Sequence, residues 1–275
     1  MWTWPGNRVW PTLNRQGISM KITQIRNATQ HLEFGGVRFL IDPMLCEKGS
    51  FPGFPGTLDE DLANPLVDLP MPLERIVDVD AVFVSHMHED HWDTAPAEAL
   101  SKSLPVLVQD EADAAEIRKV GFTDVRVVTD GMDFRGVTLH RTRTMHKVET
   151  VFKAMPPEFL RACGLVVSHP SEKTTYLAAD TIWYDKVAHA IAAHRPEVII
   201  LNCGNAQVFG MGRVIMNASD VLAVHKAAPS ATLVGTHMEA INHCVLTRAG
   251  LQGFAEQHGF SQQLLLPADG ETVVP

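Results

Sequence analysis

The sequence SHMHEDH occupies residues 85–91 and directly follows the apolar run VFV at residues 82–84. It brings three histidines and one aspartate, all potential metal ligands, into a single short loop. Imidazole is the commonest ligand for zinc, and a neighbouring carboxylate extends the choice of metal to manganese and iron. A polar surface loop with chance histidines is the alternative, but the tight spacing after a buried-type strand favours a metal-binding loop.

The spacing within this loop predicts how its ligands are divided. In an extended segment successive side chains point to opposite sides, so His86, His88 and Asp90 would share one side. His91 would face away, and one loop could then serve two neighbouring metal ions. A hydrolytic centre with two metals needs about three protein ligands for each ion, so we expect further ligands from elsewhere in the chain.

Three further candidate ligands each follow a predicted strand. They are His146 after residues 137–144, Asp180 after residues 174–179 and His237 after residues 231–236. Their positions at strand ends make them the expected partners of the histidine loop.

The size and charge of the chain limit the class of protein. A chain of 275 residues that is 45% hydrophobic can bury a large core, and α/β or sandwich domains of this size often form one unit. The formal net charge of −9 disfavours a nucleic-acid partner, because phosphate backbones are bound by clustered lysine and arginine. No apolar run approaches the ~18 residues of a membrane helix, and the N-terminus lacks the pattern of a signal peptide. These features predict a cytoplasmic enzyme without a membrane partner.

Four cysteines are widely spaced and form no Cys-x-x-Cys pair. They are Cys46, Cys163, Cys203 and Cys244. This pattern indicates neither a disulfide framework nor a thiolate zinc site. We expect small buried apolar side chains at these positions.

The first nineteen residues differ from the rest, because they hold Trp2, Trp4 and Trp10 among prolines and glycines. So apolar a segment is expected to dock, either on its own domain or in a homo-oligomer contact. A translation start placed too early, with Met20 as the true start, is the alternative. We therefore expect an arm at residues 1–19 and a single hydrolase domain at residues 20–275.

Apolar runs alternate with turn signals along the rest of the chain. After a strand at residues 21–24, a hairpin is predicted at residues 30–41 with its turn at Gly35-Gly36. Further strands are predicted at residues 80–85, 105–109, 125–129, 136–145, 162–167, 174–179, 197–202 and 231–236. Helices are predicted at residues 96–102, 111–120, 187–194, 218–227 and 248–258. The Pro/Gly-rich residues 44–74 form either a functional loop or a surface loop packed by its own two phenylalanines.

With its seven candidate ligands in this order, the chain resembles the metallo-β-lactamase superfamily, and residues 34–43 look like that superfamily's opening hairpin. The resemblance covers nearly all of residues 20–275 and is closest to the ascorbate-6-phosphate lactonase-like branch, then to the N-acyl-phosphatidylethanolamine phospholipase D-like branch. It implies an α/β fold, a four-layer αββα sandwich, with the site at the edge of two sheets. It also implies a first metal on His86, His88 and His146, a second on Asp90, His91 and His237, and Asp180 as the bridge.

The chemistry of such a site predicts a hydrolase with two divalent ions, zinc first and manganese or iron as alternatives. Two dications, two aspartates and a bridging hydroxide would leave a net charge of about +1, which suits a small anionic substrate or a developing oxyanion. Asp90 and Asp180 are then the catalytic carboxylates that position metal and hydroxide. Lactonase-like chemistry is expected, with a phosphodiesterase or phospholipase D-like hydrolase as the alternative. From another class, the alternative is a metal-binding scaffold or sensor without turnover.

Five further residues are weaker candidates for contacts around the metals or with substrate: Asp42, Tyr184, Asn205, Asn217 and His243. Asp42 ends a strand and is either an acceptor that orients the histidine loop or a turn residue before Pro43. Tyr184, Asn205 and Asn217 follow strands, where turn chemistry is the simpler reading, and Asn217 is also a predicted helix cap. His243 could serve as a proton donor or a rival ligand, although a surface helix histidine is favoured.

Overall fold

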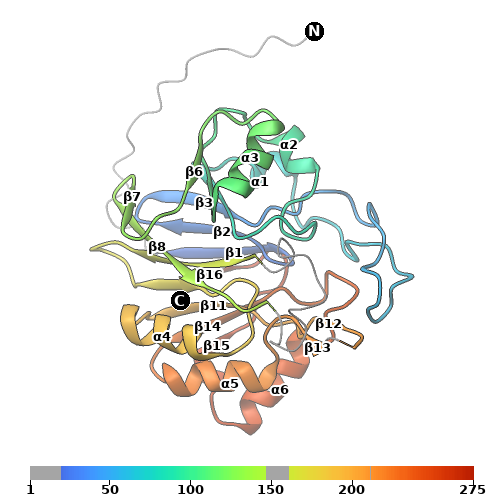
Figure 1. Ribbon diagram of the computed structural model, residues 1–275. Helices are drawn as coiled ribbons and strands as arrows, with labels where there is room; N and C mark the ends of the chain where they lie inside the picture. The colour runs from blue at the N-terminus through green and yellow to red at the C-terminus, as the bar shows by residue number, and fades with distance from the viewer. Residues whose placement is uncertain (1–19, 147–160, 211) are drawn as a thin grey trace.

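The computed structural model describes residues 20–146, 161–210 and 212–275. The arm predicted at residues 1–19 lies outside these residues. Two seven-stranded sheets form the centre of the described chain, and helices cover the outer face of each (Figure 1). This order of helix, sheet, sheet and helix confirms the predicted α/β class and four-layer sandwich.

The first sheet has the strand order β16-β1-β2-β3-β4-β5-β6. Its strands are β16 (Thr272–Val273), β1 (Lys21–Arg26), β2 (Thr29–Phe34), β3 (Val37–Ile41), β4 (Ala81–Val84), β5 (Val106–Val108) and β6 (Val125–Val127). The predicted hairpin is confirmed, with Gly35 and Gly36 at φ values of 57° and 82° that favour glycine in so tight a turn. From β3 to β6 the strands run parallel.

The second sheet has the strand order β15-β14-β11-β10-β9-β8-β7. Its strands are β15 (Leu264–Leu265), β14 (Thr232–Thr236), β11 (Val198–Asn202), β10 (Thr175–Leu177), β9 (Cys163–Ser168), β8 (Val137–Arg143) and β7 (Met132–Phe134). A separate hairpin pairs β12 (Gln207–Val208) with β13 (Gly212–Arg213). The sequence predicts no strand at β7, β12, β13, β15 or β16, which have only two or three residues each.

The helices divide between the two outer faces. The first sheet is covered by α1 (Leu73–Ile76), α2 (Ala95–Ala99) and α3 (Glu111–Lys119), and the second by α4 (Asp185–His194), α5 (Ala218–Ala227) and α6 (Arg248–Gln257). A short 3-10 turn, η3 (Ser261–Gln263), follows α6. In the described ranges, none of the helices has both the length and the hydropathy needed to cross a membrane.

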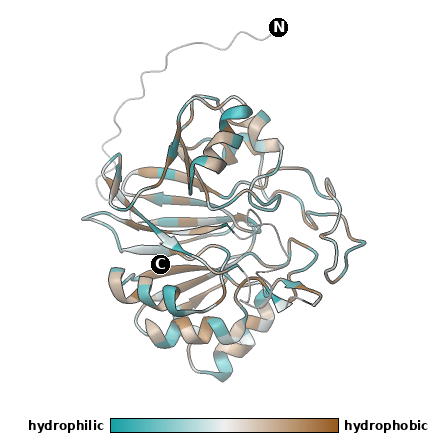
Figure 2. Cartoon of the chain, in the orientation of Figure 1, coloured by the Kyte–Doolittle hydropathy of each residue, from teal (hydrophilic) through white to brown (hydrophobic). Residues whose placement is uncertain are grey.

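Alternating side chains of one strand belong to different cores, which explains its continuous apolar run. In β4, Phe83 packs between the sheets, whereas Val82 and Val84 pack against the helices. Figure 2 shows brown residues in the strands of both sheets, between helices that carry both brown and teal residues. Because β3 runs parallel to β4, and β10 and β14 both run parallel to β11, the carboxyl ends of each set gather at one edge of their sheet. The histidine loop, Asp180 and His237 follow the ends of β4, β10 and β14, whereas His146 follows β8, which pairs antiparallel with β9.

Candidate metal centre

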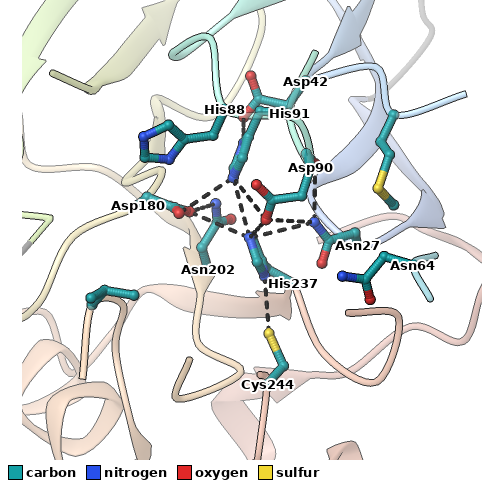
Figure 3. A network of polar contacts seen from close by, with 12 residues as sticks. Asn27, Asp42, Asn64, His88, Asp90, His91, Asp180, Asn202, His237 and Cys244 are labelled. Atoms are coloured by element: carbon teal, nitrogen blue, oxygen red, sulfur yellow. Dashed lines mark hydrogen bonds and ion pairs between the residues drawn. The ribbon is translucent and has the colours of Figure 1, made fainter. Parts of the chain in front are cut away.

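Asp42 follows β3 directly and Ser85 follows β4, so the two residues meet at the carboxyl edge of a parallel pair. The Asp42 carboxylate accepts hydrogen bonds from the Ser85 backbone N–H and hydroxyl, each at 2.7 Å, and lies 2.9 Å from Nδ1 of His91 (Figure 3). The residue is 1% exposed. Of the two roles weighed from the sequence, these contacts favour an acceptor that orients the histidine loop.

These hydrogen bonds also assign the protons of two imidazoles. The Ser85 hydroxyl donates its hydrogen to Asp42, so at 2.9 Å it can only accept from Nδ1 of His86. Nδ1 of His91 likewise donates to Asp42. When these rings are neutral, both present Nε2 as a lone pair on the side away from Asp42, which is the tautomer that metal ligation requires.

The loop does not stay extended through His91. The backbone N–H groups of His91 and Trp92 both donate to the carbonyl of His88 at 2.9 Å, which closes a turn. His91 is thereby brought back beside His86, with ring centroids 4.0 Å apart. The expectation that His91 faces away from the other ligands is wrong, because a hydrogen-bonded turn replaces the strand alternation after His88.

Three single residues from the second half of the chain complete the centre, and each is held by a neutral partner. Nδ1 of His146 lies 3.0 Å from the carbonyl of Val214, and Oδ1 of Asp180 accepts a hydrogen bond from Asn202 at 2.6 Å. Nδ1 of His237 lies 3.4 Å from Sγ of Cys244. His237 follows β14 at a φ of 60°, a left-handed conformation that turns its ring toward the histidine loop.

All seven residues expected as ligands meet in three overlapping groups. In each group the potential ligand atoms lie within 4.8 Å of one another. The groups are His86, His88 and His146; His86, His91 and Asp180; and Asp90, His91 and His237.

Asp180 is the side chain that reaches across the whole set. Its Oδ2 lies 3.3 Å from Nε2 of His91 and 3.5 Å from Nδ1 of His146, while its Oδ1 lies 3.7 Å from Nε2 of His237. Ring nitrogens also face each other closely, at 3.2 Å between His91 and His237. Five imidazoles and two carboxylates that converge in this way fit two divalent cations.

The histidines of the centre fall into two groups, one with lowered and one with raised pKa values. Burial, with the neighbouring His91, holds the pKa of His86 well below its usual value, and burial lowers the pKa of His146 to about 3. Burial opposes protonation of His91 too, but Asp180 and Asp90 outweigh it and raise its pKa to about 10. The pKa of His237 is raised well above its usual value by Asp180 against the same effect of burial. Protons on His91 and His237 thus balance the two aspartates, and a bound cation would replace them.

The sequence did not point to Asn27, which joins the two halves of the centre. It lies between β1 and β2 at a φ of 54°, and its Nδ2 donates to the carbonyl of Asp90 at 3.1 Å. Its own carbonyl accepts from the backbone N–H of His237 at 3.0 Å. An asparagine between two predicted strands signals a left-handed turn, but not these distant contacts.

Three weaker candidates have local roles in the structure. Asn217 caps α5, since its side chain accepts from the Asp220 N–H at 3.0 Å, as the sequence predicts. Asn205 adopts a φ of 53° in a turn and donates its N–H to the carbonyl of Met216. Tyr184 precedes α4 and packs against the core beneath that helix. A contact of any of the three with substrate stays a prediction.

His243 is not the surface helix residue that was favoured. It lies in a turn before α6 and is only 8% exposed. Its ring stands edge-on to Phe54, with centroids 4.8 Å apart. The helix begins later, at Arg248, because Thr247 caps it by accepting from the Gly250 N–H.

Comparison with known proteins places this geometry among described families. The family description Beta-lactamase superfamily domain matches residues 37–238. The chain is 45% identical over 255 residues to UPF0173 protein YddR of Bacillus subtilis (strain 168), covering 92% of this chain and 99% of that protein. It is 27% identical over 223 residues to a UPF0173 metal-dependent hydrolase of Xanthobacter autotrophicus, covering 78% and 82% respectively.

Two solved structures are similar over nearly their whole length. The isothiocyanate hydrolase from Delia radicum gut bacteria superposes with a TM-score of 0.90 at 45% identity, covering 92% of this chain and 98% of that one. A possible metal-dependent hydrolase from Veillonella parvula DSM 2008 superposes with a TM-score of 0.91 at 35% identity, covering 94% and 100%.

Proposed function

This chain belongs to the beta-lactamase superfamily and is a metal-dependent hydrolase, and from that premise we propose that it works with two divalent metal ions and opens small electrophilic substrates, isothiocyanates first. The observation that carries the two-metal proposal is the single carboxylate of Asp180, which lies within 4 Å of imidazoles in both halves of the ligand set.

We assign the ligands by the groups that the geometry forms. His86, His88 and His146 would hold one ion, and Asp90, His91 and His237 the other, with Asp180 between them. Five imidazoles favour zinc, and the two carboxylates keep manganese and iron as alternatives.

When bound, the two ions would polarise the bond to be opened and lower the pKa of a water between them. The residues of the chain prepare the place for this chemistry. Asp42 fixes the tautomer of His91 directly and that of His86 through Ser85. Asp90 and Asp180 are buried. Their burial indicates a site shielded from bulk water, where the electrostatic interactions between charged groups are stronger than in solution.

The isothiocyanate proposal is supported by a relative with 45% identity, nearly complete coverage and a name that states this activity. Hydrolysis converts R–N=C=S and water to R–NH₂ and O=C=S. A C–O bond forms, the C–N bond breaks, and both hydrogens of the water end on the amine nitrogen. The central carbon of the substrate is electrophilic, so it suits a site that activates water.

The test is a substrate screen with protein loaded separately with zinc, manganese and iron. We expect release of benzylamine from benzyl isothiocyanate to exceed the hydrolysis of lactones, phosphodiesters and β-lactams. The control is Asp180→Asn, which keeps the shape of the side chain but removes its charge. A preference for a lactone or a phosphodiester would overturn the isothiocyanate proposal in favour of the chemistry expected from the sequence. A protein that binds metal but turns over none of these would favour a scaffold.

Several finer expectations stay predictions. They are the ascorbate-6-phosphate lactonase-like branch, an anionic substrate, a homo-oligomer, a cytoplasmic location, and the division into an arm at residues 1–19 and a domain at residues 20–275.

A further inference from the structure

Two loops distant in sequence are joined beside the metal centre, and we call residues 51–64 and 241–244 together the clamped wall. Asn242, 4% exposed, holds them together with both its side chain and its backbone. Its contacts are Oδ1 with the Phe54 N–H (3.2 Å) and the Asn64 side chain (2.9 Å), Nδ2 with the Thr57 hydroxyl and the Leu58 carbonyl (2.8 Å each), and its own N–H with Oδ1 of Asn64 (2.9 Å). So many bonds to one buried amide fix the position of the wall.

The clamped wall borders the centre through Cys244 and His243. Cys244 contacts His237, and Figure 3 shows this pair at the edge of the cluster. His243 directly precedes Cys244, so the contact of Cys244 with His237 places it beside the ligand group of His237. His88 is the one ligand of the seven that is only partly buried, so its side of the centre is the least covered.

The hydrogen-bonding capacity of the His243 ring is only partly used. Its Nδ1 is buried and has no hydrogen-bond partner within the described ranges. A buried ring nitrogen is costly to leave without a partner, so this one is available to hydrogen-bond a group bound in the site. Burial lowers the pKa of His243 to about 4, so the ring is neutral near pH 7 and can hydrogen-bond without carrying a charge.

We propose that His243 is a substrate-contacting residue, whose ring N–H donates a hydrogen bond to the nitrogen next to the carbon under attack while Phe54 packs against the substituent on that nitrogen. The clamped wall then selects substrates with an apolar substituent. Phe54 is suited to this because it joins an apolar cluster with Met44, Phe51 and Ile241. This inference rests on the proposed function.

The experiment compares His243→Leu and His243→Gln with His225→Leu in zinc-loaded protein. His225 is the matched control, because it also packs on a phenylalanine ring, Phe260, and has a buried Nδ1 without a partner in the described chain, but it lies on α5. For benzyl isothiocyanate, His243→Leu should lower kcat/KM by about 10–100-fold with the metal content unchanged. His243→Gln should restore most of this loss, and His225→Leu should change little.

Two further measurements distinguish a contact of His243 with substrate from a purely structural role of this residue. Phe54→Ala should raise KM more for benzyl than for methyl isothiocyanate. His243→Gln should leave the pH profile of kcat/KM unchanged between about pH 6 and 9, since a neutral ring does not titrate there. Loss of metal in His243→Leu, loss of one limb of the profile in His243→Gln, or a kcat/KM within twofold of wild type in His243→Leu would each overturn the proposal.

A binding measurement keeps the inference distinct from the proposed activity. Benzyl azide, a stable molecule whose benzyl-bound nitrogen accepts a hydrogen bond as that of the isothiocyanate does, should shift the ring ¹⁵N signals of His243 in the zinc-loaded protein. If these signals shift but no isothiocyanate is hydrolysed, the proposed function alone fails. If isothiocyanate is hydrolysed and the signals do not shift, this inference alone fails.

Discussion

The two halves of the chain supply ligands to the centre in different ways. The first sheet contributes His86, His88, Asp90 and His91 from one loop after β4, whereas the second contributes His146, Asp180 and His237 from three separate strand ends. The first loop is tied to a buried carboxylate, Asp42.

The residues of the second half are held by neutral partners: the Val214 carbonyl, the Asn202 amide and the Cys244 thiol. Hydrogen bonds to a charged group are roughly twice as strong as those between neutral groups. In the second half, Asn202 also bonds a charged group, the carboxylate of Asp180. We therefore expect the first loop, whose buried carboxylate Asp42 makes three such contacts, to be the more rigid part and the second half to be the part that adjusts to it.

The most severe test of this comparison is Asp180→Ala, because Asp180 contacts the imidazole of His91 from the first half and those of His146 and His237 from the second. We expect kcat to fall by about 1,000-fold or more, with the fold kept. Steady-state kinetics, metal analysis and circular dichroism measure the three quantities. Near-normal turnover in metal-replete buffer would show that the halves need no shared carboxylate.

A smaller effect is expected from Asp42→Ala, which leaves three buried donors of the histidine loop without their acceptor. Zinc affinity should fall by about 10–100-fold, the usual cost of removing a group that orients metal ligands. Competition with a chelating dye gives the affinity. The matched change in the second half is Cys244→Ala, which should cost clearly less; equal losses would contradict a rigid first half and an adjustable second half.

The pH dependence of metal binding should also differ between the two ligand groups, the one with His86, His88 and His146 and the one with Asp90, His91 and His237. His86 and His146 have lowered pKa values and already present neutral rings at pH 7, whereas the raised pKa values of His91 and His237 keep those rings protonated. A metal must displace their protons, so affinity at the second group should rise with pH, about tenfold per unit for each proton released. Calorimetry in two buffers of different ionisation enthalpy counts the protons. Equal proton release on binding of the two ions would refute this difference between the two ligand groups.

The smallest effect on activity is expected from Gly204→Ala in the second half. A Cβ at Gly204 would stand 2.0 Å from the backbone carbonyl of His237, so the variant should lose about 1–3 kcal/mol of unfolding free energy. If the second half adjusts, kcat should stay within a few-fold. Gly253→Ala is the control, since its Cβ meets nothing within 4 Å in α6 and a helical alanine should stabilise. Urea titration compares the two.

The sequence could identify much of this centre because only a few side-chain types bind metal ions. The dense loop at residues 85–91 and the strand ends before His146, Asp180 and His237 were enough to name the seven residues that meet. The path of the loop was not predictable in the same way. The turn that returns His91 depends on two hydrogen bonds to the His88 carbonyl, and no side-chain pattern reveals it.

The supporting residues escaped prediction for a different reason. The bonds from Asn27 to Asp90 and from Asn242 to Asn64 join residues 63 and 178 positions apart. The first forms only once the first sheet has assembled, and the second only once the two halves of the chain have packed together. Their local signals are those of ordinary turn asparagines. His243 was misplaced for the same reason, because its burial comes from Phe54 in a distant loop.

The contact between His91 and His237 has a consequence for the lifetime of the protein. It closes a span of 146 residues, a closure that costs the chain considerable entropy. Metals held across it would act as removable cross-links between the sheets and stabilise only the folded state. A strong chelator should then speed unfolding and expose the seam between the sheets to proteases. Metal supply would thus govern how long each molecule survives, in addition to whether it is active.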